Sequence, residues 1–189
     1  MIQTGDILFQ IDHLEELGRG IQEVTEKCGQ PNFTHVGVAK KEHEDVFVLE
    51  ANISGVVKTP LDQFLACSEQ QGNRAIVAVK RLKSPYQYTI PQAISRIESV
   101  LGRSYNFTFL PENEEFYCSE LVQYAFVDRE NHSLFPPVPL SFSNAKGEVS
   151  EFWIDYYKKF DMEVPLHALG SNPNNLYQSP YLELVENLF

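Results

Sequence analysis

The feature that most constrains the fold is a pair of runs rich in β-branched and apolar residues on either side of a short charged segment. The runs are Phe33–Ala39 and Val46–Ala51, and the segment between them contains Lys-Lys-Glu-His-Glu-Asp. Two such runs joined by a polar turn are typical of an antiparallel β-hairpin. We therefore expect a hairpin here, with a tight turn at Glu42 and His43.

A turn at that position would pair His35 directly with Glu50. Residues that face each other in an antiparallel pair share one face of the sheet, with Cβ atoms roughly 4.5–5.5 Å apart. A carboxylate at that distance can orient an imidazole ring and favour its charged form. A slip of one residue would separate the two side chains. The opposite face of this hairpin would carry an apolar set, namely Val36, Val38, Phe47 and Leu49.

The rest of the chain alternates short strands with amphipathic helices and contains no linker or repeat, which predicts one α+β domain over residues 1–189. Strands are expected at Ile7–Gln10 and Ala75–Leu82. Helices are expected at His13–Cys28, from Thr59 to about Cys67, from Ile90 to Leu101, at Cys118–Asp128 and at Phe152–Phe160. In the second of these helices, Thr59 would supply the hydroxyl cap and Pro60 the first helical position. Gly170–Pro180 is expected to be irregular chain that either lines a pocket or wraps the domain.

Charge and composition exclude several classes of protein. Fifteen Lys and Arg against 26 Asp and Glu give a formal net charge of −11, which disfavours nucleic acid and anionic lipid surfaces as partners. No apolar run is long enough to span a membrane. Three Cys and five His form no close ligand pair, so neither a metal nor another cofactor is expected. The sequence as given predicts a cytoplasmic protein, or a periplasmic or secreted one if a signal peptide has been removed; it leaves the oligomeric state open.

Cys118 has the position of a reactive thiol. It begins a predicted amphipathic helix, and a helix N-terminus or a neighbouring imidazolium lowers the pKa of a thiol. Taken singly, Cys118 could be a buried structural cysteine, His35 a core histidine and Glu50 a solvated strand-end charge. Together they are the nucleophile, base and orienting carboxylate that a catalytic triad requires.

Four short motifs occur in a fixed order: Gly5-Asp6-Ile7-Leu8, Thr34-His35-Val36-Gly37-Val38, Val48-Leu49-Glu50-Ala51 and Tyr117-Cys118-Ser119-Glu120-Leu121-Val122. Together they resemble the circularly permuted papain-like amidases of the YiiX type. This group belongs to the broader NlpC-type superfamily, whose permuted branch also holds relatives of lecithin:retinol acyltransferase. The resemblance implies an α+β papain-like fold with an antiparallel sheet, in which the strand-borne histidine precedes the helix-borne cysteine.

The resemblance also implies roles for individual residues. Cys118 matches the nucleophile, His35 the general base and Glu50 the orienting third member. The backbone N–H of Cys118 would be one oxyanion donor, and the second donor cannot be placed from the sequence. Tyr117 and Tyr105 lie near the motif and are candidates for substrate contact, although aromatic residues more often belong to the core.

The function expected from these residues is hydrolysis of a small amide or peptide through a thioester, without a cofactor. Cell-wall peptide fragments are the substrate class that the resemblance implies. The alternatives are a lipid acyl hydrolase or acyltransferase that uses the same triad, and a noncatalytic ligand-binding module on the same fold. The acidic chain shows neither a basic nor an amphipathic membrane-docking face, which favours the amide.

Overall fold

The computed structural model describes residues 1–12, 31–111, 114–144 and 146–188. Its centre is a six-stranded antiparallel sheet with the strand order β10-β7-β1-β2-β3-β4. The strands are β1 (Ile7–Gln10), β2 (His35–Glu42), β3 (Asp45–Asn52), β4 (Gly55–Pro60), β7 (Val77–Leu82) and β10 (Leu182–Asn187). Two small ladders pair β5 (Gln70–Gln71) with β6 (Arg74–Ala75), and β8 (Val138–Pro139) with β9 (Leu169–Gly170).

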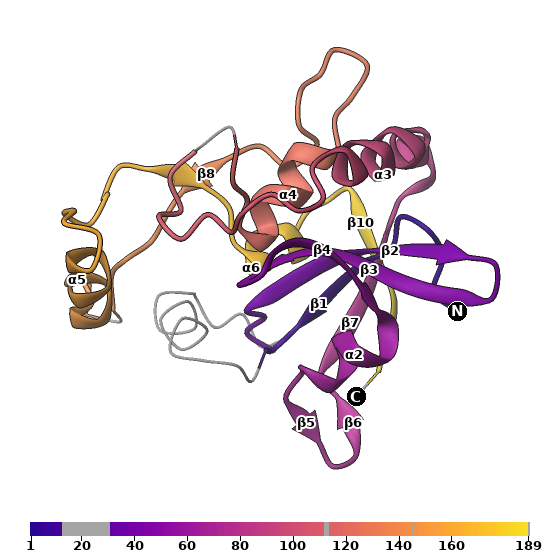
Figure 1. The fold of residues 1–189 in the computed structure, drawn as a ribbon, viewed down its shortest axis with the longest axis horizontal. Helices are drawn as coiled ribbons and strands as arrows, with labels where there is room; N and C mark the ends of the chain where they lie inside the picture. The colour runs from indigo at the N-terminus through magenta and orange to yellow at the C-terminus, as the bar shows by residue number, and fades with distance from the viewer. Residues whose placement is uncertain (13–30, 112–113, 145, 189) are drawn as a thin grey trace.

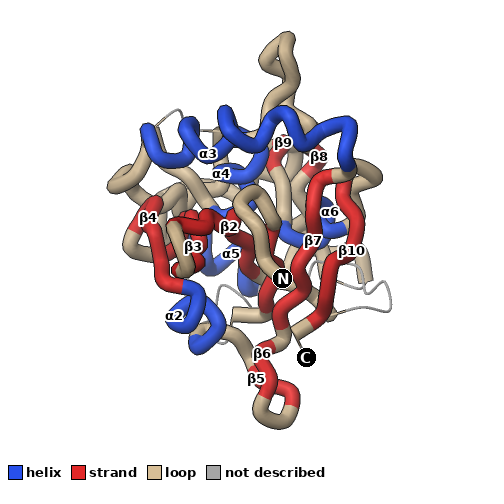
Figure 2. Tube along the Cα trace, turned by 90° about the vertical axis from the view of Figure 1, so that its right-hand side faces the viewer, coloured by secondary structure: helices blue, strands red, loops and turns tan. Residues whose placement is uncertain are grey.

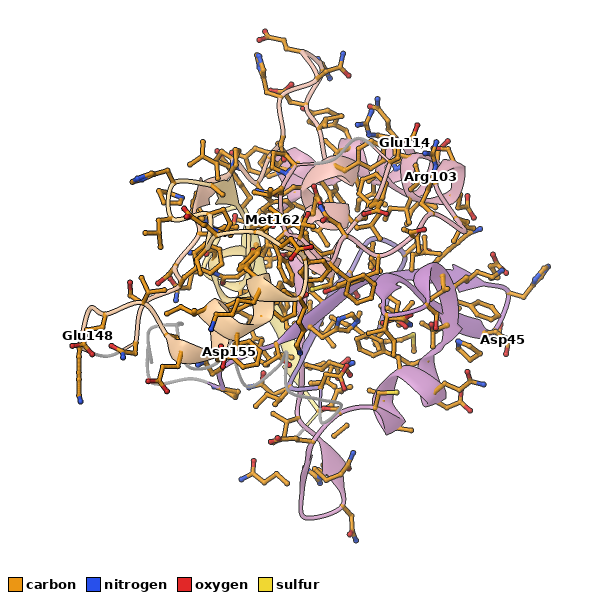
Figure 3. All side chains as sticks on the ribbon, turned by 60° about the vertical axis from the view of Figure 1, so that its left-hand side comes forward. Asp45, Arg103, Glu114, Glu148, Asp155 and Met162 are labelled. Atoms are coloured by element: carbon orange, nitrogen blue, oxygen red, sulfur yellow. The ribbon has the colours of Figure 1, made fainter. Side chains whose placement is uncertain are left out.

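Helices cover both faces of the sheet (Figures 1 and 2). On one side lie α3 (Ile90–Ser99), which follows a 3-10 turn at Ser84–Thr89, and α4 (Cys118–Ala125), with α6 (Pro173–Tyr177) beside α4. On the other side lies α2 (Leu61–Ala66). Helix α5 (Glu151–Lys158) stands away from the sheet, and Asp155 on it points outward (Figure 3).

Alternation along the strands explains why both faces are covered. In β1, Ile7 and Phe9 belong to the larger buried cluster, which includes Leu121 of α4, whereas Leu8 belongs to a smaller cluster that includes Phe64 of α2. All five side chains are almost fully buried. A strand that is apolar at consecutive positions requires such a layer on each side.

Several predicted elements are confirmed. The strand at Ile7–Gln10 has the predicted bounds. The helices predicted from Ile90, Cys118 and Phe152 are present as α3, α4 and α5, and no end differs from its prediction by more than three residues. The predicted helix His13–Cys28 lies outside the described residues.

Other predictions were wrong in instructive ways. Residues 170–180 are not irregular, because they contain α6, whose Asn172 side chain caps the helix by accepting from the Asn175 N–H. The strand predicted at Ala75–Leu82 is divided into β6 and β7. Strands β4 and β10 were missed; both lie on the outer edges of the sheet.

The predicted register of the β2–β3 hairpin was also wrong. Glu42 pairs with Asp45, so the turn is at His43 and Glu44, and Glu50 lies opposite Gly37 instead of His35. His43 has a φ of 55°, and positive φ at the first central position suits a two-residue hairpin turn. The resulting shift of two residues leaves every side chain on its predicted face, because the side-chain period of a strand is two.

Gly55 allows the β3–β4 turn to lie against the chain that follows α3. The Val56 N–H donates to the Arg103 carbonyl (2.8 Å), and the Gly102 N–H donates to the Val56 carbonyl (2.8 Å). Gly55 has a φ of 102°, and a Cβ there would collide with the Arg103 carbonyl oxygen. The Arg103 side chain forms an ion pair with Glu114 (3.5 Å), and the two lie side by side in Figure 3.

We expect Gly55→Ala to destabilise the fold by about 2–5 kcal/mol, from backbone strain and from the clash with the Arg103 carbonyl. Gly72→Ala is the matched control, because Gly72 also has a positive φ (65°) but a Cβ added there would have no atom within 4 Å. The control should lose only about 1–2 kcal/mol. Urea denaturation of both variants measures the difference, and equal losses would show that the close approach to Arg103 contributes nothing.

Candidate active site

His35 and Glu50 are joined by a short hydrogen bond in the interior of the protein. The His35 Nε2–H donates to Glu50 Oε2 at 2.5 Å. Both residues are buried, with 7% and 4% of their surfaces exposed. The structure therefore brings His35 and Glu50 together as the sequence analysis predicted, although the strands pair in a register two residues away from the predicted one.

Gly37 makes this contact possible. Glu50 lies opposite Gly37 and diagonal to His35, and diagonal neighbours are about 7–8 Å apart between backbones, within reach of long side chains. A Cβ at Gly37 would lie 3.3 Å from the Glu50 Cβ and would collide with a Val48 methyl group. The absence of a side chain at Gly37 thus leaves the space across which Glu50 reaches His35.

The second carboxylate oxygen of Glu50 is held by two further residues. The Thr59 hydroxyl donates to Glu50 Oε1 at 2.5 Å, and the Asn52 side-chain amide donates to the same atom at 3.2 Å. The prediction that Thr59 caps α2 was wrong, because Pro60 occupies the cap position and no side chain caps that helix. The missed strand β4 explains the error: it places Thr59 on the same face as Glu50 and diagonal to it.

These contacts favour the charged forms of both partners. Burial alone would raise the pKa of Glu50, but hydrogen bonds from His35, Thr59 and Asn52 lower it below its usual value. Burial alone would lower the pKa of His35, but interactions with Cys118 and with Glu50 raise it well above the usual histidine value. This environment therefore favours the protonated form of the His35 imidazole.

Cys118 is the first residue of α4 and is 4% exposed. Helix α4 packs against β2 and β3, the strands that carry His35 and Glu50. The first turn of the helix is fixed by Glu120, whose carboxylate accepts from the Tyr117 N–H at 3.2 Å. The structure therefore places the Cys118 thiol at a helix N-terminus and close enough to His35 to affect its pKa.

Tyr117 is anchored to the C-terminal part of the chain. Its hydroxyl accepts from the Ser171 N–H at 3.0 Å, and burial raises the pKa of Tyr117 to about 12. A Cβ at Gly170 would lie 2.6 Å from the same hydroxyl, so a glycine is needed for this approach. Tyr105 is also buried, which raises its pKa well above the usual value.

A cavity of about 50 Å³ adjoins Cys118. Its wall includes both candidate tyrosines, Tyr105 and Tyr117. It also includes Ser119 of α4, Trp153 of α5 and, from loops, Phe109, Phe142 and Ser171. Ser119 belongs to the Cys118 motif and Ser171 to the segment 170–180, but no local signal marked the three aromatic residues.

The arrangement of ligand-type side chains and the lengths of the helices bear on metal binding and membrane insertion. Among the residues that the structure describes, no group of three or more His, Cys, Asp or Glu side chains is placed to hold a metal ion. In the same part of the chain, no helix has the length and apolar character needed to cross a membrane.

A thiol at a helix N-terminus, near a strand-borne histidine that is hydrogen-bonded to a carboxylate, is the arrangement of papain-like proteins, with the histidine here preceding the cysteine in the chain. Comparison with protein families agrees. Residues 1–186 match the family described as permuted papain-like amidase enzyme, YaeF/YiiX, C92 family, and the chain belongs to that family.

Two relatives support the assignment. The chain is 25% identical to the uncharacterized protein YiiX of Escherichia coli (strain K12) over 185 residues, which cover 97% of this chain and 85% of YiiX. A crystal structure of YiiX from Escherichia coli O157:H7, described as a metalloprotein, superimposes with a TM-score of 0.78 at 25% identity. The superposition covers 98% of this chain and 97% of the YiiX chain in that crystal structure.

We expect His35 to retain its proton at higher pH than an ordinary histidine, because Cys118 and Glu50 raise its pKa. In Glu50→Gln the charge that favours the imidazolium is gone, so the His35 titration midpoint should fall by about one unit or more. NMR titration of the imidazole C–H resonances measures this shift. Glu44→Gln, which removes an exposed carboxylate of the turn, is the control and should leave His35 unchanged; the expectation fails if both variants behave alike.

Proposed function

We propose that the chain is a cysteine amidase or peptidase that hydrolyses a small amide, with Cys118 as nucleophile, His35 as general acid and base, and Glu50 as the orienting carboxylate. The observation that carries the proposal is the position of Cys118 at the N-terminus of α4, which packs against β2 and β3, the strands whose His35 and Glu50 are hydrogen-bonded to each other. Membership in a family of permuted papain-like amidases supports the reaction class.

The proposed reaction has two stages. In the first, the Cys118 thiolate attacks the amide carbonyl carbon, and the protonated His35 gives its proton to the nitrogen as the C–N bond breaks. The amine leaves and a thioester remains. In the second, His35 takes a proton from water and the hydroxide attacks the thioester carbonyl carbon. The C–S bond breaks, the carboxylic acid is released, and the Cys118 thiolate and protonated His35 are restored.

The N-terminus of α4 would stabilise the charge on the carbonyl oxygen. The backbone N–H of Cys118 lies in the first turn, where helix N–H groups have no partner within the helix and the helix dipole favours negative charge. A donor in that position acts on the tetrahedral intermediate as an oxyanion hole does.

Glu50 would act through His35. Its Oε1 is occupied by Thr59 and Asn52, so only Oε2 is left to hold the imidazole, and the ring cannot easily rotate away. An orienting carboxylate of this kind fixes the tautomer and stabilises the imidazolium that forms during the reaction. Thr59 and Asn52 are therefore positioning residues in this proposal.

The first test is the rate at which iodoacetamide alkylates Cys118 between pH 4 and 9, read by peptide mass spectrometry. We expect labelling well below the pH at which an ordinary thiol reacts, and a fall of about tenfold or more at pH 6 in His35→Ala. His43→Ala, which changes an exposed turn histidine, is the matched control. Slow labelling that is the same in all three proteins would contradict the proposal and favour a binding module.

The second test is turnover of a panel of neutral peptide amides, cell-wall peptide fragments and lipid acyl esters. Glu50→Gln should lower kcat by roughly 10²-fold or more, with a smaller change in KM, because the imidazole loses its orientation and charge stabilisation. Thr59→Val should lower kcat less. Amide turnover that survives Cys118→Ala would refute the assigned nucleophile, and turnover of esters alone would favour the lipid acyl hydrolase.

A further inference from the structure

The cavity next to Cys118 has features that select for one kind of substrate. We propose that it binds a neutral apolar group, aromatic or branched, that flanks the scissile amide and carries a hydrogen-bond acceptor such as a second amide carbonyl. This inference rests on the proposed function and specifies its substrate class. Three independent observations carry it.

The first observation is the character of the wall. Tyr105, Phe109, Phe142 and Trp153 supply aromatic surface, and Leu140 adds an aliphatic side chain. None of the described residues that line the cavity is Asp, Glu, Lys, Arg or His. A charged substituent placed there would lose its water without gaining a counter-charge, so neutral groups are favoured.

The second observation is the backbone of Phe109. Its φ of 57° is unfavourable for a bulky residue, and such strain persists only where the surroundings impose it. Three hydrogen bonds to the flanking carbonyls impose it here: Tyr156 OH to Phe107 O (2.7 Å), Tyr157 OH to Thr108 O (2.8 Å) and Asn106 Nδ2 to Leu110 O (2.5 Å).

Because of this backbone conformation, the Phe109 ring packs between Tyr117 and Trp153. The ring centroids are 5.2 Å from Tyr117 and 5.8 Å from Trp153. Tyr117 directly precedes Cys118 in the chain, so this part of the wall lies next to the thiol. An aromatic surface of this kind favours contact with an apolar group of the substrate.

The third observation is a set of buried polar atoms without partners. Among the described residues four such side-chain atoms occur, and three of them belong to residues that line this cavity: Ser119 Oγ, Ser171 Oγ and Trp153 Nε1. The fourth is Gln10 Oε1 in β1. Buried polar groups are almost always hydrogen-bonded, so three exceptions around one cavity point to a ligand that supplies the missing partners.

The chemistry of these atoms defines what the ligand must offer. An indole N–H can only donate, and a serine hydroxyl can donate as well as accept. A carbonyl oxygen is therefore the group that satisfies Trp153 and either serine. A neutral peptide or N-acyl amino amide combines such a carbonyl with an apolar side chain.

Trp153 provides a direct test, because it is the only tryptophan in the sequence and it lines the cavity. Its fluorescence is followed, with excitation at about 295 nm, while Cys118→Ala is titrated with N-acetylphenylalaninamide, N-acetylphenylalanine and N-acetylglycinamide. We expect saturable binding of N-acetylphenylalaninamide and at least tenfold weaker binding of N-acetylphenylalanine, which carries a carboxylate. N-acetylglycinamide, which lacks the apolar side chain, should not bind. Equal responses to all three, or no response to any, would overturn the proposal.

A second variant separates ligand recognition from structural support. Ser171→Ala removes a hydroxyl that has no partner in the free protein and keeps the backbone N–H that holds Tyr117. This variant should leave the midpoint of thermal unfolding unchanged or raise it, and should weaken the binding of N-acetylphenylalaninamide by about five- to tenfold. Ser95→Ala, at an exposed position on α3, is the control and should change neither quantity. A loss of stability without a loss of affinity would show that the serine is merely structural.

These measurements distinguish failure of this inference from failure of the proposed function. Binding to Cys118→Ala needs no turnover, and alkylation of Cys118 needs no occupant of the cavity. Rapid, His35-dependent alkylation together with no probe binding would refute the substrate class alone. Probe binding together with an ordinary thiol would support the cavity and refute the enzyme.

Discussion

The hydrogen bond between His35 and Glu50 is the interaction on which the rest of the site depends. Two ionisable groups are buried side by side, and a buried charge is tolerated only where partners replace the lost water. Glu50 therefore requires Thr59 and Asn52 as well as His35. Those requirements account for a glycine at position 37, where a side chain would crowd Glu50, and for the place of β4, which carries Thr59, next to β3.

The sequence predicted the hairpin, the helix that begins at Cys118 and the common face of His35 and Glu50. The common face was predicted correctly because strand alternation is a local pattern with a period of two. Moving the turn by one residue shifts the pairing by two residues, which changes the partners and keeps each side chain on its face. The actual contact is diagonal, because the turn is centred on His43 and Glu44. That register depends on the positive φ of His43, which the residue type alone does not determine.

The parts that could not be predicted depend on contacts between distant segments. Thr59 has the local grammar of a helix cap, and only pairing with β3 directs its hydroxyl to Glu50 instead. The cavity wall combines loops around residues 105–109, 140–142 and 171–173 with α5, and no periodicity links those segments. Family resemblance supplied the order of the histidine and cysteine motifs.

The bond between Tyr117 and Ser171 has a consequence for the order in which the molecule is assembled. His35 and Glu50 are only 15 residues apart and Thr59 follows Glu50 by 9 residues, whereas the tyrosine before Cys118 finds its partner 54 residues later. During synthesis the residues of this pair and its support are therefore all present well before the surroundings of the thiol are complete. A nascent chain would carry its base early and acquire a finished nucleophile site only near the end of translation.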